Sequence, residues 1–373
     1  MEAGAPWSRT TSRALALGGV HALVDCASGY LIFRDLGTSA LGYPTIVTLV
    51  VLYNTLAFGG QVPVGAITDR TRTYRGAAVL GALLAATSLV VAPWAVIAGI
   101  VVVGVGNALF HVGAGAHVLA ASRNRSTESG VFVGPGAVGL AAGILMGGQR
   151  LEARWFIVTL LVVAVFLLPR LIEPSARSGQ ASSLPRPRSR ALLITLACAS
   201  MLVGSVTVRA LVGGAVSGSW RGISTEVMLL LALAACGGKM LGGFVSDRLG
   251  WATTSVAALL ISAPLVSALV RTPVGAVLGM LIFQMTMPVT LKAMHHILPT
   301  RPGLAFGIPC LALLVGALPG LYRVQLLPHW AHSLALVVTS AVLVGWGLRL
   351  LVRAGADGGP RPEFARALRP TAS

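Results

Sequence analysis

An acid and an imidazole stand four residues apart in the first long apolar stretch of the chain. Asp25 is the one carboxylate well inside such a stretch, and His21 lies about one helical turn before it, on the same helix face. A charge inside a bilayer costs at least about 2.5–3.5 kcal/mol, so each one needs a reason to be there. Histidine exchanges protons near neutral pH, and the pair could therefore take up and release a proton. The alternative is a fixed structural hydrogen bond to a neighbouring helix.

A guanidinium lies deep in an apolar stretch of the second half of the sequence. Arg209 could pair with Asp25 across a central cavity, or it could receive an anionic substrate. The alternative is that its long side chain reaches out of the membrane to the surface.

Other polar side chains also fall inside apolar stretches. His111, with Asn107 four residues earlier, and Gln284 are candidates to line a substrate cavity, although a lone histidine in a membrane helix is more often a packing residue. Basic side chains near the ends of apolar stretches are expected to reach or anchor at the cytoplasmic surface; these are Lys239, Lys292, His295 and His296.

The elements that must position these groups are membrane helices. The chain has 373 residues, 55% of them hydrophobic and 10% charged, with a mean hydropathy of +0.83. A bilayer core takes roughly 20 helical residues to cross, and an all-α bundle satisfies its backbone polar groups internally. About twelve spans are predicted, near residues 14–33, 46–67, 76–92, 97–119, 130–148, 154–171, 191–214, 225–245, 252–270, 273–291, 304–322 and 331–352. Pro309 and Pro319 make the eleventh the weakest and favour a kink there.

The net charge of +17 follows the predicted topology. Most of the 28 Lys and Arg residues fall in segments that lie inside if the N-terminus is cytoplasmic. This bias predicts a multi-pass protein of the plasma (inner) membrane with both termini in the cytoplasm, and it gives no support to a nucleic-acid partner.

Catalytic and cofactor signals are missing from the sequence. The four cysteines fall within spans without metal-ligand spacing, and no Gly-x-x-x-x-Gly-Lys-Ser/Thr loop for ATP is present. We expect no enzyme activity, no metal and no cofactor. The expected partners are a small-molecule substrate, protons and the lipid bilayer, with the protein as a monomer.

One short pattern occurs twice. GAITDRTRTYR begins at Gly65 and GFVSDRLG begins at Gly243, and each closes the second span of a six-span set. The segment 173–190, rich in Ser, Pro and Arg, separates the two sets and is predicted to be a cytoplasmic linker. The expected organisation is an N-terminal half at 1–172, this linker, and a C-terminal half with a cytoplasmic tail at 191–373. Repeats of this kind are typical of transporters with a site between the halves.

The repeated pattern resembles the loop signature of the major facilitator superfamily, Gly-x-x-x-Asp-Arg followed by basic residues. The resemblance covers essentially the whole chain and implies a conformational latch on the cytoplasmic side, formed by Gly65, Asp69, Arg70, Gly243, Asp247 and Arg248. The first copy departs from the family form at Thr71-Arg72, and the second lacks the final basic pair.

A narrower resemblance concerns HALVDCASGYL, GNALFHVGAGAHV and VTVRALVGG, which look like the first, fourth and seventh helices of fosmidomycin-resistance-type efflux carriers. The acid that these carriers have after the histidine of the fourth helix is missing, because Val112-Gly113 follows His111. Gly134-Pro135-Gly136 also resembles a fifth-helix motif associated with antiport, and an ordinary kink is the alternative.

These observations favour proton-coupled efflux of a small organic solute by alternating access. Proton-coupled metabolite uptake is the alternative, and a transporter-like receptor or assembly protein is a third interpretation.

Overall fold

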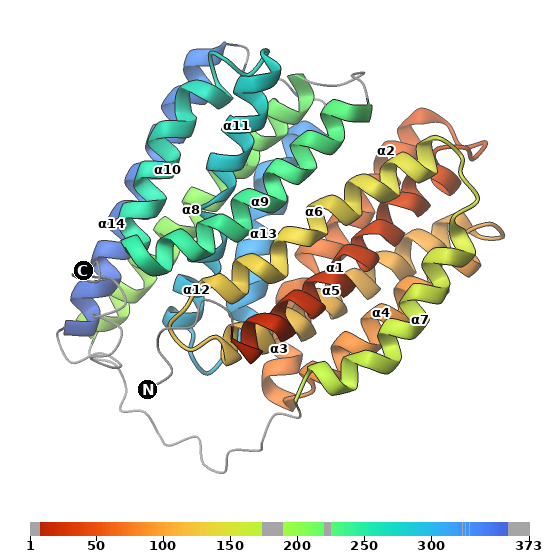
Figure 1. Cartoon of the computed structure of the whole chain (residues 1–373), viewed down its shortest axis with the longest axis horizontal. Helices are drawn as coiled ribbons and strands as arrows, with labels where there is room; N and C mark the ends of the chain where they lie inside the picture. The colour runs from red at the N-terminus through yellow and green to blue at the C-terminus, as the bar shows by residue number, and fades with distance from the viewer. Residues whose placement is uncertain are drawn as a thin grey trace.

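The structure is a computed structural model that describes residues 8–173, 189–219, 225–322, 324, 326–327 and 329–356. Its regular elements are helices in two groups, which Figure 1 shows side by side, the first in red to yellow-green and the second in green to blue. The first group contains α1 (Arg9–Leu31), η1 (Ile32–Leu36), α2 (Tyr43–Asn54), η2 (Thr55–Gly59), α3 (Gln61–Thr71), α4 (Tyr74–Val91), α5 (Val96–Ala121), α6 (Thr127–Gly148) and α7 (Arg154–Leu171). The second contains α8 (Ser189–Ser219), α9 (Thr225–Leu249), α10 (Trp251–Val266), α11 (Pro273–Gln284), α12 (Met287–Ile297), α13 (Pro302–Leu321) and α14 (Trp330–Ala356).

The predicted spans are present as helices. Within the described residues, 11 helical stretches are long and apolar enough to cross a membrane, and α10, with 16 residues, is a shorter apolar helix. The tenth crossing is divided at Met285-Thr286, where Pro288 in the first turn of α12 cannot donate a backbone hydrogen bond. The eleventh is not interrupted, since α13 continues through Pro309 and Pro319. Residues 174–188 of the predicted linker and 357–373 of the predicted tail lie outside the described residues, and the domain boundaries stay predictions.

The two halves meet along pairs of helices with one member from each. α6 packs along α9, and α3 packs along α13. We call the end of the bundle where α1 begins the terminal end; α5 ends there, and α6 and α13 begin there (Figure 1). The topology predicted from charge makes this the cytoplasmic end.

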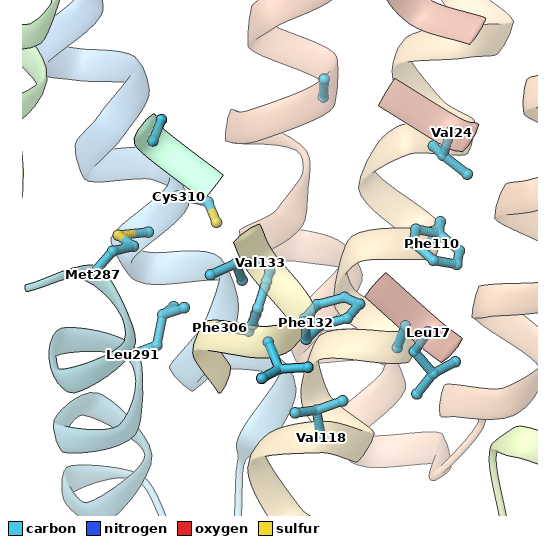
Figure 2. Packing of buried hydrophobic residues seen from close by; sticks show 14 of the residues in the cluster. Leu17, Val24, Phe110, Val118, Phe132, Val133, Met287, Leu291, Phe306 and Cys310 are labelled. Carbon is cyan, nitrogen blue, oxygen red and sulfur yellow. The ribbon is translucent and has the colours of Figure 1, made fainter. Parts of the chain in front are cut away.

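An apolar layer joins the halves near the terminal end. Figure 2 shows Phe132 of α6 beside Phe306 of α13, and their ring centroids are 6.0 Å apart. Leu17 and Val118 of the N-terminal half lie close to this contact and are fully or nearly fully buried. Of these four residues, Phe132 and Phe306 make the contact between the halves.

Candidate functional site

Asp25 lies at the centre of a polar cluster in the N-terminal half. Its Oδ2 is 3.1 Å from His21 Nε2, and its Oδ1 is 3.7 Å from His111 Nε2. Asn107 Nδ2 donates to Asp25 Oδ1 over 3.0 Å and lies 3.4 Å from the Tyr53 hydroxyl. The carboxylate is therefore held by groups from α1 and α5. We call His21, Asp25, Asn107 and His111 the acid–imidazole cluster.

The two imidazoles of the cluster are in direct contact. The Nε2 atoms of His21 and His111 are 2.7 Å apart. The Nδ1 of His21 lies 2.9 Å from the carbonyl oxygen of Phe132, and the Nδ1 of His111 lies 2.9 Å from that of Asn107. Backbone carbonyls thus fix both rings at their Nδ1 atoms, and the two Nε2 atoms meet beside Asp25.

The Gly134-Pro135-Gly136 segment of α6 forms one wall of the cluster. Pro135 has no N–H to donate to the Val131 carbonyl four residues earlier, and the neighbouring Phe132 carbonyl lies 2.9 Å from His21 Nδ1. A Cβ at Gly136 would lie 2.6 Å from His21 Cε1 and 2.7 Å from Asp25 Oδ2. The glycine is required for the close approach of this side-chain pair to α6.

The same residues are the one place in the described chain where three potential metal ligands converge. Ligand atoms of His21, Asp25 and His111 lie within 4.8 Å of one another. Two nitrogens on one tetrahedral ion with bonds near 2.0–2.1 Å would be roughly 3.3 Å apart. The observed 2.7 Å is a hydrogen-bond distance instead, so the arrangement fits a proton better than a metal ion.

Arg209 is buried in the C-terminal half and does not meet Asp25. Its guanidinium donates to the hydroxyl of Thr286, to that of Thr290 at 3.0 Å and to the carbonyl of Ser205 at 3.4 Å. It is 6% exposed, which contradicts the alternative that it reaches the surface. Among the described residues no carboxylate lies within ion-pair distance, so its charge is solvated by hydroxyls at the break between α11 and α12.

Gln284 and Lys239 are two further polar residues of the C-terminal half. Gln284 lies 3.6 Å from Met280 Sδ, one turn earlier in its own helix. Lys239 does not reach the terminal end as expected. Its Nζ lies 3.4 Å from the Val133 carbonyl on α6, next to the carbonyl that holds His21.

Asp69 joins the two halves at the terminal end. Its carboxylate accepts from the backbone N–H groups of Gly303 at 2.8 Å and Leu304 at 2.9 Å, in the first turn of α13. The Tyr74 hydroxyl donates to the same carboxylate at 2.7 Å. A Cβ at Gly65 would lie 2.6 Å from the Gly303 carbonyl carbon, so this glycine permits the approach. A negative charge at a helix N-terminus is stabilised by unpaired N–H groups and the helix dipole.

Asp247 makes the equivalent contact in the opposite direction. It accepts from the backbone N–H groups of Ser126 at 2.7 Å and Thr127 at 3.0 Å, where α6 begins. A Cβ at Gly243 would lie 2.8 Å from Thr127 Cα. Each half therefore supplies a carboxylate that caps a helix of the other half.

Lys292 supplies a third contact between the halves, and the expectation that it is a surface anchor is wrong. Its side chain is fully buried, and its Nζ donates over 2.8 Å to both the Leu119 carbonyl and the Ser122 hydroxyl. These acceptors lie at the C-terminal end of α5, where a positive charge is favourable. A cation of the C-terminal half thus caps a helix of the N-terminal half.

Comparison with solved structures decides the fold. No protein-family model matches the chain, and no curated protein sequence does. The human organic anion transporter MFSD10 superposes with a TM-score of 0.65 at 15% identity, covering 91% of this chain and 99% of that one. The outward conformation of FucP, a Major Facilitator Superfamily transporter, gives 0.63 at 12% identity over 91% and 98%. A variant of the E. coli fucose:proton symporter FucP gives 0.60 at 12% over 92% and 98%. The chain has the major facilitator fold.

Within the major facilitator fold, the repeated loops occupy equivalent places in the two halves, as the sequence predicts. Asp69 and Asp247 contact the opposite half, whereas Arg70 is exposed and Arg248 donates to Phe244 in its own helix. His111 and Asn107 lie against Asp25, and their role in lining a substrate cavity stays a prediction. The narrower resemblance to fosmidomycin-resistance carriers stays a prediction.

Three residues of the site were missed from the sequence. Tyr53 has only a hydroxyl to mark it in the sequence, and Lys239 was assigned to the membrane surface because a long side chain can reach it. Glu128 lies just before a predicted span, yet it is buried and accepts from Thr11 at 3.0 Å. The sequence showed only an acidic residue at the start of a helix, and its contact with the start of α1 follows from the tertiary structure.

Proposed function

We propose that the chain is a secondary active transporter that moves a small organic solute by alternating access and is driven by protons. The observation that carries this proposal is the acid–imidazole cluster, an ionisable site enclosed within one half of a two-half bundle. Asp25 retains 17% side-chain exposure, whereas His21 retains 6%. Phe132 and Phe306 lie between the cluster and the terminal end. The described conformation therefore favours proton access from the opposite end, and rocking of the halves would reverse it.

Export is the direction that we propose first, from a plasma membrane in which both termini are cytoplasmic. Its support is the place of Gly134-Pro135-Gly136 against the acid–imidazole cluster, where a motif associated with antiport could affect proton binding. Arg209 is proposed to balance negative charge on the solute, because no described carboxylate pairs with its guanidinium. Gln284 is proposed as a further substrate contact.

Uptake together with protons is the second candidate, and Lys239 favours it. Its ammonium acts electrostatically on Asp25. A solute anion beside Lys239 would offset that positive charge and make proton binding at the cluster easier. Such mutual reinforcement is the thermodynamic basis of symport. One solved structure with this fold is described as a fucose:proton symporter.

Inverted membrane vesicles with an acidic lumen test both directions. An exporter should accumulate the compound as protons leave the lumen, and the Asp25→Asn variant should lose the proton movement. An importer should instead release preloaded compound together with protons. Solute movement that does not depend on the pH gradient would contradict proton coupling. If a set of candidate small organic compounds is tested and none of them moves, the result would contradict transport and favour a receptor or assembly role.

A further inference from the structure

We propose that the coupling proton lies between the Nε2 atoms of His21 and His111, with Asp25 as the ionised counter-charge and not as the proton carrier. This inference rests on the proposed proton coupling and assigns its site.

The Nδ1 atom of each ring lies against a backbone carbonyl oxygen. A backbone carbonyl oxygen can only accept a hydrogen bond, so a ring nitrogen 2.9 Å away must carry the hydrogen. The Phe132 carbonyl fixes the proton of His21 on Nδ1, and the Asn107 carbonyl does the same for His111. A neutral imidazole has one N–H, so both Nε2 atoms would be bare acceptors if both rings were neutral.

Two bare nitrogen lone pairs cannot face each other over 2.7 Å without a bridging group. One added proton resolves the contact, because one ring becomes an imidazolium and donates to the other. Placing that proton on Asp25 does not help, since both Nε2 atoms would remain bare. The geometry therefore puts the first proton of the cluster between the rings.

The surroundings suit a cation at this position. Asp25 lies 3.1 Å from His21 Nε2 and accepts from Asn107 over 3.0 Å, as an ionised carboxylate would. The ion pair of imidazolium and carboxylate is neutral overall, which lowers the cost of enclosing it in a membrane helix bundle.

Groups from other elements also face the cluster. α2 contributes the Tyr53 phenol, and α6 contributes backbone carbonyls. Lys239 of α9 and Cys310 of α13 come from the C-terminal half, and both interact electrostatically with Asp25. Lys239 is the one cation among these neighbours. When the Lys239 ammonium lies close to the cluster, as in its contact with the Val133 carbonyl, its positive charge weakens proton binding between the rings. Movement of Lys239 away from the cluster would strengthen proton binding there.

The experiment uses the full chain in lipid nanodiscs with ¹⁵N-labelled histidine. Near neutral pH we expect one pair of histidines coupled through an N–H···N hydrogen bond, with Nδ1 protonated in both rings. The coupled signal should disappear in His21→Gln and in His111→Gln. His332→Gln, which removes an exposed histidine, is the matched control and should leave the signal unchanged. Thermal unfolding of each variant confirms that it is folded.

Several results would overturn the assignment. One is an NMR spectrum in which both rings are neutral and uncoupled. Another is an infrared band of a protonated carboxyl group that disappears in Asp25→Asn. A third is a stoichiometric bound transition metal that is lost in His111→Gln. Vesicle flux separates this inference from the proposed function. Proton-linked flux that survives in a folded His111→Gln variant contradicts the shared proton but leaves the proposed function intact. A coupled histidine pair in a protein without proton-linked flux supports the shared proton and contradicts the proposed function.

Discussion

At the scale of single residues, the position of the acid–imidazole cluster depends on the absence of a side chain at Gly136. The sequence left open whether Gly134-Pro135-Gly136 is a motif associated with antiport or an ordinary kink. In the structure, Pro135 leaves the Val131 carbonyl without its helix hydrogen bond, and Gly136 makes room for His21 and Asp25. The Gly134-Pro135-Gly136 segment is thus part of the wall of the candidate site.

Replacing Gly136 with alanine should therefore disturb the geometry of the acid–imidazole cluster without destabilising helix α6. The new methyl would lie 2.6 Å from His21 Cε1, which forces the ring or the helix to shift. We expect loss of proton-linked flux with normal yield and fold, because alanine itself favours helix by up to about 1 kcal/mol. Gly19→Ala on α1, where a Cβ meets nothing within 4 Å, is the control and should transport normally.

Two ion pairs at the end of the bundle opposite the terminal end differ in burial and should differ in energy. Arg154 pairs with Asp35 at 2.6 Å, with side chains only 14% and 9% exposed. Arg34 pairs with Glu152, whose side chain is 79% exposed. Breaking a buried pair leaves an uncompensated charge, so Arg154→Met should lower the free energy of unfolding by about 3 kcal/mol. Arg34→Met should cost at most about 1 kcal/mol.

Unfolding in mixed detergent micelles would measure both losses. Equal effects of the two variants would show that burial does not distinguish these pairs.

At the scale of helices, opposite charges cap opposite helix ends across the interface between the halves. Carboxylates meet the N-termini of α13 and α6, and the Lys292 ammonium meets the C-terminus of α5. Each contact matches the sign of the helix end that it meets. The sequence indicated the two carboxylates through their repeat, but Lys292 has no repeated partner and was interpreted as a surface anchor.

Removing the charge of Lys292 should open the terminal end. Hydrogen bonds to charged groups contribute about 1.5–3 kcal/mol, so Lys292→Met should shift the equilibrium between closed and open forms by roughly ten-fold or more. Spin labels at Arg75 and Leu249, both exposed near this end, would report the change as a longer distance. Arg301→Gln removes an exposed charge nearby and should leave the distances unchanged. An unaltered distribution in Lys292→Met would show that this contact does not hold the halves together.

At the scale of the whole molecule, the repeat makes the two carboxylate contacts equivalent but physically separate. Asp69 belongs to the N-terminal half and Asp247 to the C-terminal half, and each caps a helix of the other. If the halves move as rigid bodies, both contacts break in the same motion, and their free energies should add.

The double variant Asp69→Asn with Asp247→Asn should therefore open the terminal end by the sum of the two single effects. The same pair of spin labels measures all three variants. Sub-additive effects would mean that the halves open unevenly, with one contact breaking before the other.

The sequence by itself determined the helical class, the repeat and the candidate ionisable residues inside the apolar spans. Apolar runs of span length allow few other structures in a bilayer, and a charge that remains inside one is conspicuous. His21 and Asp25 could be paired from their spacing, because neighbours along one helix follow from its 3.6-residue turn.

Contacts between helices were decided only by the tertiary structure. Nothing in the local sequence of His111 shows that its Nε2 meets that of His21, or that Asp25 and Arg209 stay apart. The rotation and depth of each helix are set by packing against its neighbours, down to the room left by Gly136. The proton site is therefore a property of how α1, α5 and α6 pack together and not of any one of their sequences.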